Sequence, residues 1–362
     1  MRKRSSQGTD LNSRRATLND VARRAKVSPV TVSRAIRHPE MVSEVLRLRI
    51  DDAVRVLNYI PNHLASALAS TRTHIIGAIV PSVTNGVFDD YLAAIQDVVG
   101  RAGIQMLVLN SRYSQLEEEK AIETLLGYHP EAMILVGVDQ TERSRQLLKN
   151  SGIPVAQTMD VTDTPIDMVF GFDHRAAGDA AVRYLIEQGH KRIAHLTVQT
   201  DPRAGRRRQG YEDAMRSHGY STEGLISAAL RPSTVVRGGE MFAEVLARAP
   251  DLTAVFTCND DLALGTLFEC HRRGIRVPRD VAIVGFNDLE FCEASVPPLT
   301  SVATERREAG VWAAEAIVEI IRGSGKRPKS PAIDMGFSIK ERGSSSASGA
   351  SLRSSPPSKA KA

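Results

Sequence analysis

The sequence predicts two structural parts, a small all-α head near the N-terminus and a larger α/β core of two doubly wound parallel-sheet lobes. Three observations predict this. Closely spaced helical patterns without a strand fill residues 16–60, short apolar runs alternate with helical stretches from Ile75 to about Val284, and the alternation restarts after Gly189. Strands that alternate with helices of ten or more residues form parallel sheets from βαβ units, so the restart indicates a second lobe.

These patterns divide the chain into five segments. We expect a disordered basic arm at 1–15, a helix-turn-helix domain at 16–60, a helix and linker at 61–73, a core at 74–343 and a disordered Ser- and Pro-rich tail at 344–362. Within the core, lobe one takes about 74–173 and 303–332, and lobe two takes about 174–300 and 333–343.

The charge of the chain is unevenly distributed. The net charge is +5 over 362 residues, yet residues 1–72 hold 14 Lys/Arg and 6 Asp/Glu, while the remainder holds 33 Lys/Arg and 36 Asp/Glu. A basic head on a slightly acidic body favours a polyanionic partner for the head. The alternative is an ordinary charged surface without such a partner.

Several function classes are disfavoured by what the sequence lacks. It contains no uncharged apolar run of membrane-spanning length, and its first 15 residues carry no apolar segment, so we expect a cytoplasmic protein without a secretory signal. Its three cysteines form no C-x-x-C pair. No dinucleotide, zinc-protease or hydrolase motif is present, so we expect no enzyme, no cofactor and no metal. A transport-type sugar-binding protein and an α/β enzyme remain the alternatives.

The head carries the strongest local signal, the segment ATLNDVARRAKVSPVTVSRAIR at 16–37. Thr17 and Asp20 predict an N-terminal cap, and Ser28 before Pro29 predicts the start of a second helix. Two short helices joined by a tight turn are typical of a helix-turn-helix reader of DNA. The residues expected to face the core of this domain are Val21, Ala22, Ala25, Val32 and Ile36 in the first two helices, and Val45, Leu48, Ile50, Ala53, Val54 and Leu57 in a third helix at about 43–57. A generic three-helix domain is the alternative.

A short helical stretch, NYIPNHLASALAS, follows the head and places Leu64 and Leu68 on one face. A helix of this length is marginal in water, so it can fold upon binding a template, and an exposed leucine can wedge between base pairs. A plain linker helix packed on its neighbours is the alternative.

Polar side chains gather in the core where the predicted strands end. Because parallel sheets bind ligands at the carboxyl ends of their strands, we expect a small polar-ligand cleft between the lobes. The residues concerned include Ser82, Asn85, Phe88, Asp160, Arg207, Asn259 and Asn287. For Asp173 and Asp260, which precede helices, a capping role is the alternative.

Taken together, these segments resemble the lactose-repressor (LacI) family of bacterial transcription regulators over about residues 16–340. The resemblance rests on TLNDVARRAKVSPVTVSRAI, LNYIPNHLASALA, QGYEDAM (209–215), NDDLALG (259–265), RGIRVPRDVAIVGFNDLEF (273–291) and PPLTSV (297–302). Within the family the chain is most similar to the gluconate-operon repressors, on PSVTNGVFDDYL (81–92), MD at 159–160, GFDH (171–174) and DMGF (334–337). The resemblance implies a periplasmic-binding-protein-like core.

The resemblance also implies roles for particular residues. By this resemblance, the chain is expected to contact DNA through Thr17, Pro29, Val30, Thr31, Ser33 and Arg34 in the head, and through Asn62, Ala65 and the intercalating Leu68 in the hinge. By the same resemblance, the chain is expected to bind its effector through Ser82, Asn85, Phe88, Asp160, Arg207, Asn259 and Asn287, and Arg207 is expected to bind the effector directly.

Asn287 stands where sugar-binding relatives often carry Asp, which removes a negative charge from the pocket. We therefore expect a sugar-acid effector such as gluconate or a ketogluconate, or a phosphorylated form, and an inducer that releases a homodimeric repressor from a palindromic operator. A neutral sugar or a corepressor is the alternative. The tail lacks a leucine heptad, so no assembly beyond the dimer is expected.

Overall fold

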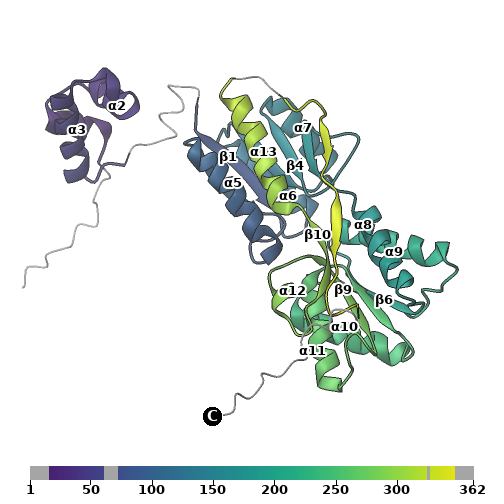
Figure 1. Ribbon diagram of the computed structural model, residues 1–362. Coiled ribbons are helices and arrows are strands. Elements are labelled where there is room, and N and C mark those ends of the chain that lie inside the picture. Colours follow the sequence, from purple (N-terminus) through teal and green to yellow (C-terminus); the bar gives the residue numbers. More distant parts are fainter. Residues whose placement is uncertain (1–15, 61–71, 324–326, 347–362) are drawn as a thin grey trace, which may run out of the picture. The chain divides into compact units, whose positions relative to one another are not determined.

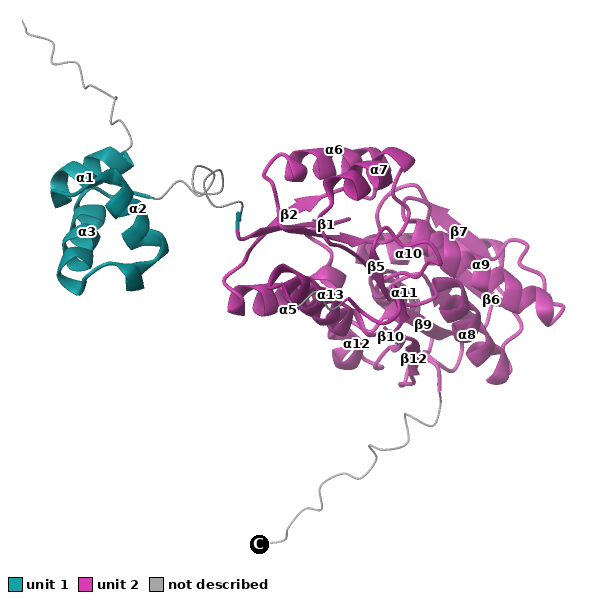
Figure 2. Ribbon diagram, turned by 90° about the horizontal axis from the view of Figure 1, so that it is seen from above, with its two compact units in different colours: residues 1–73 teal, residues 74–362 magenta. Residues whose placement is uncertain are grey.

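The computed structural model describes residues 16–60, 72–323 and 327–346, which fall into two compact units at 1–73 and 74–362 (Figure 2). The expected arm at 1–15 and residues 347–362 of the expected tail at 344–362 lie outside the described residues. The same holds for the hinge positions Asn62, Ala65 and Leu68. In the described part of the chain, no helix combines the length and apolarity that crossing a membrane demands.

Residues 16–60 form the three expected α-helices and, in addition, one short 3-10 helix. They are α1 (Leu18–Ala25), α2 (Pro29–Arg37), η1 (Pro39–Met41) and α3 (Glu44–Val56). Thr17 and Asp20 form a reciprocal capping box at the start of α1, and Lys26 ends that helix with φ of 54°. Ser28 accepts a hydrogen bond from the Thr31 backbone and so caps α2.

Three residues that were expected in the core of the head are exposed instead. Val32 and Ile50 are fully buried, but Ile36, Val45 and Leu48 are 37%, 72% and 61% exposed. The reason is helical geometry: at 100° per residue, positions two and five before Ile50 point away from the face that Ile50 occupies. The residues that share its face are Leu46, Ala53, Val54 and Leu57.

The first lobe of the core is a six-stranded parallel sheet in the order β11-β5-β4-β3-β1-β2. Its strands are β1 (Ile75–Val80), β2 (Gln105–Asn110), β3 (Ala132–Val136), β4 (Val155–Thr158), β5 (Met168–Gly171) and β11 (Ala332–Asp334). Its helices are α5 (Asp89–Arg101), α6 (Gln115–Leu126), α7 (Glu142–Ser151) and α13 (Arg306–Ile321), with η2 (Gly86–Phe88) before α5. Figure 2 shows α5 and α13 on one face of the sheet and α6 and α7 on the other.

The second lobe repeats this plan with the strand order β12-β10-β9-β8-β6-β7, in which only the β10–β12 pair is antiparallel. Its strands are β6 (Ile193–Val198), β7 (Ile226–Ala229), β8 (Ala254–Thr257), β9 (Ala282–Asn287), β10 (Thr300–Thr304) and β12 (Phe337–Lys340). Its helices are α8 (His174–Glu187), α9 (Pro202–Ser217), α10 (Val235–Arg248), α11 (Asp260–Arg273) and the short α12 (Phe291–Ala294). The matching strand orders confirm the expectation of two doubly wound lobes.

In the described part of the chain, three crossovers join the lobes, which are drawn in Figure 1. They follow β5, β10 and β11, since β5 and β11 lie in the first sheet and β10 lies in the second. The crossing points fall near Phe172, Glu305 and Met335. The expected lobe boundaries at 300–303 and 332–333 are therefore shifted by a few residues, because β10 stays paired with β9 up to Ala303 and β11 pairs with β5 through Asp334.

The C-terminal boundary of the core also lies later than expected. Ser344, Ser345 and Ser346 are buried, although the expected disordered tail includes them. The Ser344 hydroxyl donates a hydrogen bond to the Ile283 carbonyl at 2.7 Å and accepts one from the Thr300 backbone at 2.8 Å. These contacts continue the packing of the second lobe, which composition alone does not indicate.

Candidate functional site

Helix α2 carries five of the residues expected to contact DNA, namely Pro29, Val30, Thr31, Ser33 and Arg34. Pro29, Val30 and Arg34 are exposed, Val30 by 65%, while Thr31 and Ser33 are partly buried. A short exposed apolar side chain near the start of such a helix can contact a thymine methyl, and an arginine can bond a guanine edge or a phosphate. The exposed face of α2 is therefore chemically suited to the major groove.

Thr17 has a structural contact of its own. Its hydroxyl donates to the Asp20 carboxylate at 2.6 Å and accepts from the Asp20 backbone at 3.3 Å. Its backbone N–H also donates to that carboxylate, at 3.0 Å, so both donors of Thr17 are used by the cap although the residue is partly exposed.

A second candidate site is a cleft between the two lobes of the core. It lies at the carboxyl ends of strands from both sheets, where doubly wound sheets bind ligands. Lobe one contributes Asn85, Val87, Phe88, Tyr113, Met159 and Phe172, and the second lobe contributes Val198, Thr200, Asp201, Arg203, Ala204, Arg207, Pro232, Ser233, Cys258, Asn259 and Asn287. His174, Thr304 and Arg306 lie next to the crossovers and complete the lining.

The structure brings five of the seven expected effector residues to this cleft, namely Asn85, Phe88, Arg207, Asn259 and Asn287. The other two are placed elsewhere. Ser82 lies at a neighbouring hollow, where its hydroxyl accepts a hydrogen bond from the Thr84 backbone. Asp160 is 1% exposed and faces Arg206 instead of the cleft, because the chain turns after β4 and directs Met159 inward.

Arg207 is held on three sides at the floor of the cleft. Its Nε donates to His174 Nδ1 at 3.1 Å, its Nη1 donates to the Cys258 carbonyl, and its guanidinium lies 3.8 Å from the centre of the Phe286 ring. Burial lowers the pKa of the guanidinium from its ordinary value. Arginine remains charged in proteins, so a buried positive charge is present in the cleft.

The other cationic side chains of the cleft are paired with carboxylates. Arg203 bonds Asp201 through Nε at 3.0 Å and Nη2 at 3.2 Å. Arg306 bonds Asp90 at 2.9 Å. Among the described residues, Arg207 is the lining cation without a carboxylate partner. The cleft therefore offers one uncompensated positive charge.

Asn287 lies on a turn with unusual backbone conformation. Its φ is 110° and that of Asp288 is 57°, both in the left-handed half of conformational space that side chains other than glycine seldom adopt. Arg306 donates from Nη1 to the Asn287 carbonyl. The turn persists because hydrogen bonds hold it from several sides.

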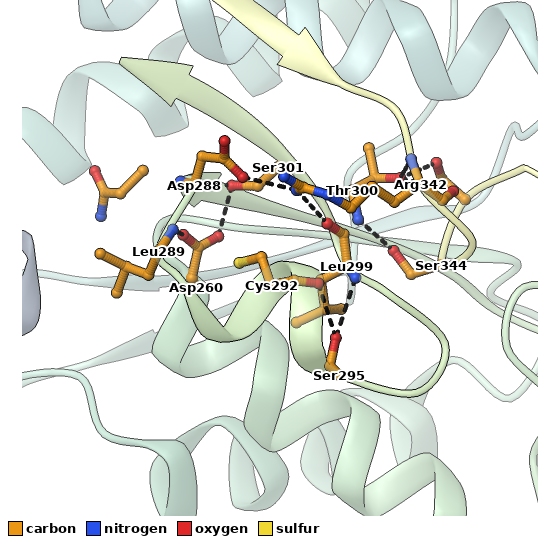
Figure 3. A network of polar contacts seen from close by, with 12 residues as sticks. Asp260, Asp288, Leu289, Cys292, Ser295, Leu299, Thr300, Ser301, Arg342 and Ser344 are labelled. Carbon is orange, nitrogen blue, oxygen red and sulfur yellow. Dashed lines mark hydrogen bonds and ion pairs between the residues drawn. The ribbon is translucent and has the colours of Figure 1, made fainter. Parts of the chain in front are cut away.

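Figure 3 shows the polar network that holds this turn from below. Arg342 donates to the Asp288 carboxylate at 2.7 Å, and the Ser301 hydroxyl accepts from the Asp288 backbone at 3.0 Å. The same Ser301 hydroxyl donates to the buried Asp260 carboxylate at 2.6 Å, whose other oxygen accepts from the Leu289 backbone at 2.9 Å. Asp260 is thus a partner of the turn and not the cap of α11.

Helix caps account for two of the other polar residues near the strand ends. Asp173 caps α8 through hydrogen bonds from the backbones of Arg175 and Ala176, as the alternative interpretation held. Asn259 combines both roles, because it caps α11 through Leu262 and lines the cleft.

Several cleft residues were not predicted from the sequence. Tyr113 reaches the cleft because it and Arg112 adopt φ of 59° and 53°, and its hydroxyl accepts a hydrogen bond from the Asn85 amide at 3.3 Å. His174 and Arg306 follow crossovers, which the sequence does not mark. Arg203, by contrast, belongs to the arginine-rich stretch that follows β6, one of the strand ends at which polar side chains were expected to gather.

Comparison with known proteins identifies both parts of the chain. The family model described as bacterial regulatory proteins, lacI family, matches residues 17–62, and the model described as periplasmic binding protein-like domain matches residues 182–345. The HTH-type transcriptional regulator GntR of Pseudomonas aeruginosa is 41% identical over 336 residues, covering 92% of this chain and 97% of that protein. The HTH-type transcriptional regulator IdnR of Escherichia coli is 34% identical, covering 91% and 98%.

Solved structures give the same result. The crystal structure of a LacI-family transcriptional regulator from Silicibacter pomeroyi superposes with a TM-score of 0.86 at 31% identity, covering 91% of this chain and 99% of that one. The fold and the two sites thus define a transcription regulator with a helix-turn-helix head and a ligand-binding core. The chain belongs to the LacI family of bacterial regulatory proteins.

Proposed function

We propose that the chain is a repressor that binds a palindromic operator as a homodimer and that a sugar acid of the gluconate or ketogluconate type controls its operator affinity. The observation that carries the effector assignment is Arg207, a buried guanidinium on the cleft floor with no carboxylate partner among the described residues. An anionic ligand supplies the missing negative charge. The proposal includes no enzymatic reaction.

The charges of the cleft favour a single carboxylate over a phosphorylated sugar acid. Arg203 and Arg306 are already neutralised by Asp201 and Asp90, so a monoanion balances the remaining charge. A phosphorylated acid brings two or three negative charges and would leave some of them unpaired in a desolvated site, which is costly. Hydroxyl groups of the sugar chain find amide partners in Asn85 and Asn287.

The head supplies the operator-binding surface. One head reads one half-site, so a two-fold dimer reads two inverted half-sites. Arg34 is the proposed reader of a base edge, and Val30 the proposed contact to a thymine methyl, because both are exposed on α2.

Effector control requires that the sugar acid bind one arrangement of the lobes more tightly than another. Arg207 lies in the second lobe, and Phe88 and Asn85 lie in the first, so a ligand that contacts all three bridges the lobes. We propose that the bridged arrangement disfavours operator binding, which makes the effector an inducer. A corepressor would produce the opposite change in operator affinity.

Calorimetry on the full chain tests the effector assignment. Gluconate and 2-ketogluconate should bind, 6-phosphogluconate should bind more weakly, and the neutral alcohol glucitol should bind weakest. Arg207→Ala removes a charge-assisted contact worth about 1.5–3 kcal/mol, so gluconate affinity should fall roughly 10- to 150-fold. Arg208→Ala is the matched control, because Arg208 lies on the same helix, pairs with Glu212 and does not line the cleft. Tight binding of glucitol alone would refute the proposal.

A mobility-shift assay with the DNA upstream of the chain's own gene tests the operator assignment. The wild-type chain should give a shift that survives excess competitor DNA and that gluconate weakens. Arg34→Ala should weaken the shift by about 1–3 kcal/mol without changing gluconate binding. A shift that competitor DNA erases completely would indicate binding without sequence specificity and would contradict the proposal.

A further inference from the structure

His174 occupies a place in the core that the binding of an effector does not by itself explain. It is the first residue of α8, directly after the crossover from the first lobe, and it is 1% exposed. Its ring packs against Phe172, with the ring centres 4.3 Å apart, and lies 6.0 Å from the Phe286 ring on which the Arg207 guanidinium stacks. A buried imidazole at this position needs partners for both of its nitrogens.

Both nitrogens of His174 have partners, and the partners determine the tautomer. Nδ1 lies 3.1 Å from Arg207 Nε, and Nε2 lies 2.8 Å from the Met159 carbonyl oxygen. A guanidinium N–H can only donate and a carbonyl can only accept, so Nδ1 carries no proton and Nε2 carries one. Burial, together with the charges of Arg207 and Arg203, lowers the pKa of His174 well below its ordinary value. The ring is therefore neutral.

This neutral ring determines how Arg207 is presented to the cleft. The guanidinium has five N–H groups. One is bonded to His174 and one to the Cys258 carbonyl, which leaves three without a hydrogen-bond partner among the described residues. A carboxylate is bound in bidentate fashion only when the guanidinium plane is correctly oriented. The bond at Nε and the contact with Phe286 define that plane.

The same ring connects Arg207 to the other lobe. Met159 follows β4 of the first lobe, where it adopts φ of 58° and lines the cleft. The Met159 carbonyl accepts a hydrogen bond from His174 Nε2. The orientation of Arg207 in the second lobe therefore depends on the backbone of the first lobe. A movement of one lobe against the other that breaks this bond also frees the imidazole to rotate.

We propose that His174 is a positioning residue that orients Arg207 toward the carboxylate of the effector and makes this orientation depend on the Met159 segment of the first lobe. The inference rests on the proposed function for the acidic nature of the effector. His174 acts on the effector through Arg207: it accepts a hydrogen bond from Arg207 at Nδ1 and donates one to the Met159 carbonyl from Nε2.

Three substitutions separate the two contacts. His174→Asn can place an oxygen acceptor at the δ position and keep the bond from Arg207, whereas His174→Gln can place an amide N–H at the ε position and keep only the bond to Met159. His174→Phe removes both. We expect gluconate affinity, measured by calorimetry at pH 7.5, to fall on the order of tenfold or more in His174→Gln and His174→Phe and to be largely kept in His174→Asn.

The matched control is His195→Phe. His195 is also buried and stacked, between Tyr211 and Phe256, and donates to a backbone carbonyl, but it does not line the cleft. This control should bind gluconate as the wild-type chain does. Operator affinity without gluconate should also be unchanged in His195→Phe. Gluconate affinity that is kept in His174→Asn but lost in His174→Gln separates a positioning role from a merely structural one, because both variants place a neutral amide at the buried site. Wild-type gluconate affinity in His174→Phe would overturn the proposal.

A second measurement does not depend on the effector. Nitrogen NMR of the ligand-free wild-type chain should show His174 with Nδ1 unprotonated and Nε2 protonated, without titration between pH 5 and 8. A protonated Nδ1, or titration near pH 6.5, would overturn the positioning role whatever the effector is. If the wild-type chain does not bind gluconate but the NMR result is as expected, the sugar-acid assignment fails and the contact of His174 with Arg207 stands.

Discussion

Arg206 of the second lobe contacts two carboxylates of the first, Asp160 at 3.0 Å and Asp139 at 2.5 Å. Asp160 is 1% exposed, and burial raises its pKa to about 6 despite the attraction of Arg206. Arg206 lies next to Arg207 on α9, and Asp160 follows Met159. The ion pair therefore crosses between the lobes beside the bond from His174 to the Met159 carbonyl, and it stabilises the arrangement of the lobes seen here.

Removing the cation of this pair should destabilise the core in a pH-dependent manner. Arg206→Met leaves the buried Asp160 carboxylate without its compensating charge, which raises its pKa further. At pH 8 we expect a loss of about 2 kcal/mol or more in the free energy of unfolding. The loss should shrink at pH 5, where the carboxyl of the variant is protonated in the folded state. Urea unfolding at the two pH values measures this.

The double variant Arg206→Met with Asp160→Asn serves as the control for this pair. Because the neutral amide carries no buried charge, the double variant should recover part of the stability lost at pH 8. Equal losses at pH 5 and pH 8 in the single variant would show that the ion pair contributes nothing specific.

Glu118 on α6 should reduce stability when it ionises. It is 8% exposed and accepts a hydrogen bond from the Gln140 amide at 3.2 Å, and burial raises its pKa from 4.5 to about 7. The protonated form is favoured in the folded state, so stability is lost as the pH rises from 4.5 through 7. Glu118→Gln should be more stable than wild type at pH 8, by up to about 3 kcal/mol, and equal to it near pH 4. Thermal or urea unfolding of both proteins between pH 4 and pH 8 measures this difference. A Glu118→Gln chain that is less stable than wild type at pH 8 would contradict the prediction.

His195 should make the core sensitive to acid. It is fully buried, and burial lowers its pKa from 6.5 to about 3. Between these values the unfolded chain binds a proton that the folded chain does not, so the contribution of His195 is present above pH 6.5 and is lost as the pH falls. Relative to His195→Phe, the wild-type chain should lose about 1.4 kcal/mol per pH unit between pH 6 and 4. Parallel pH dependences for the two proteins would contradict this prediction.

The segment from Arg342 to Ser346 should support both the stability of the second lobe and effector binding. Arg342 bonds Asp288 beside the Asn287 turn, and Ser345 bonds Tyr184 and Thr300 at 2.8 and 2.6 Å. Ending the chain after Glu341 leaves buried donors and acceptors unpaired at about 1–3 kcal/mol each, so unfolding should shift to clearly lower urea concentration and gluconate affinity should fall.

A chain ending after Ser346 is the matched control for this truncation. It keeps the hydrogen bonds of Arg342, Ser344 and Ser345 and should unfold and bind gluconate as the full chain does. If both truncated chains unfold at the same urea concentration, residues 342–346 do not stabilise the second lobe.

Local signals were sufficient for the elements of the head. The capping box of Thr17 and Asp20 and the Ser28–Pro29 start of α2 depend on neighbours within three residues, so the sequence contains the information. The buried face of α3 was predicted only in part, because apolar residues lie on more than one face of this helix. Packing against the other two helices buries the face that contains Ile50.

The sequence by itself determined the class of the fold, the restart that makes two lobes, and the polar residues at the strand ends. Alternating periodicity and short-range capping are properties of contiguous residues. The tertiary structure alone decided which of those residues meet. It turned Asp160 toward Arg206, brought Tyr113, His174 and Arg306 to the cleft, and buried Ser344, because contacts across crossovers and left-handed turns join residues that are far apart in the chain.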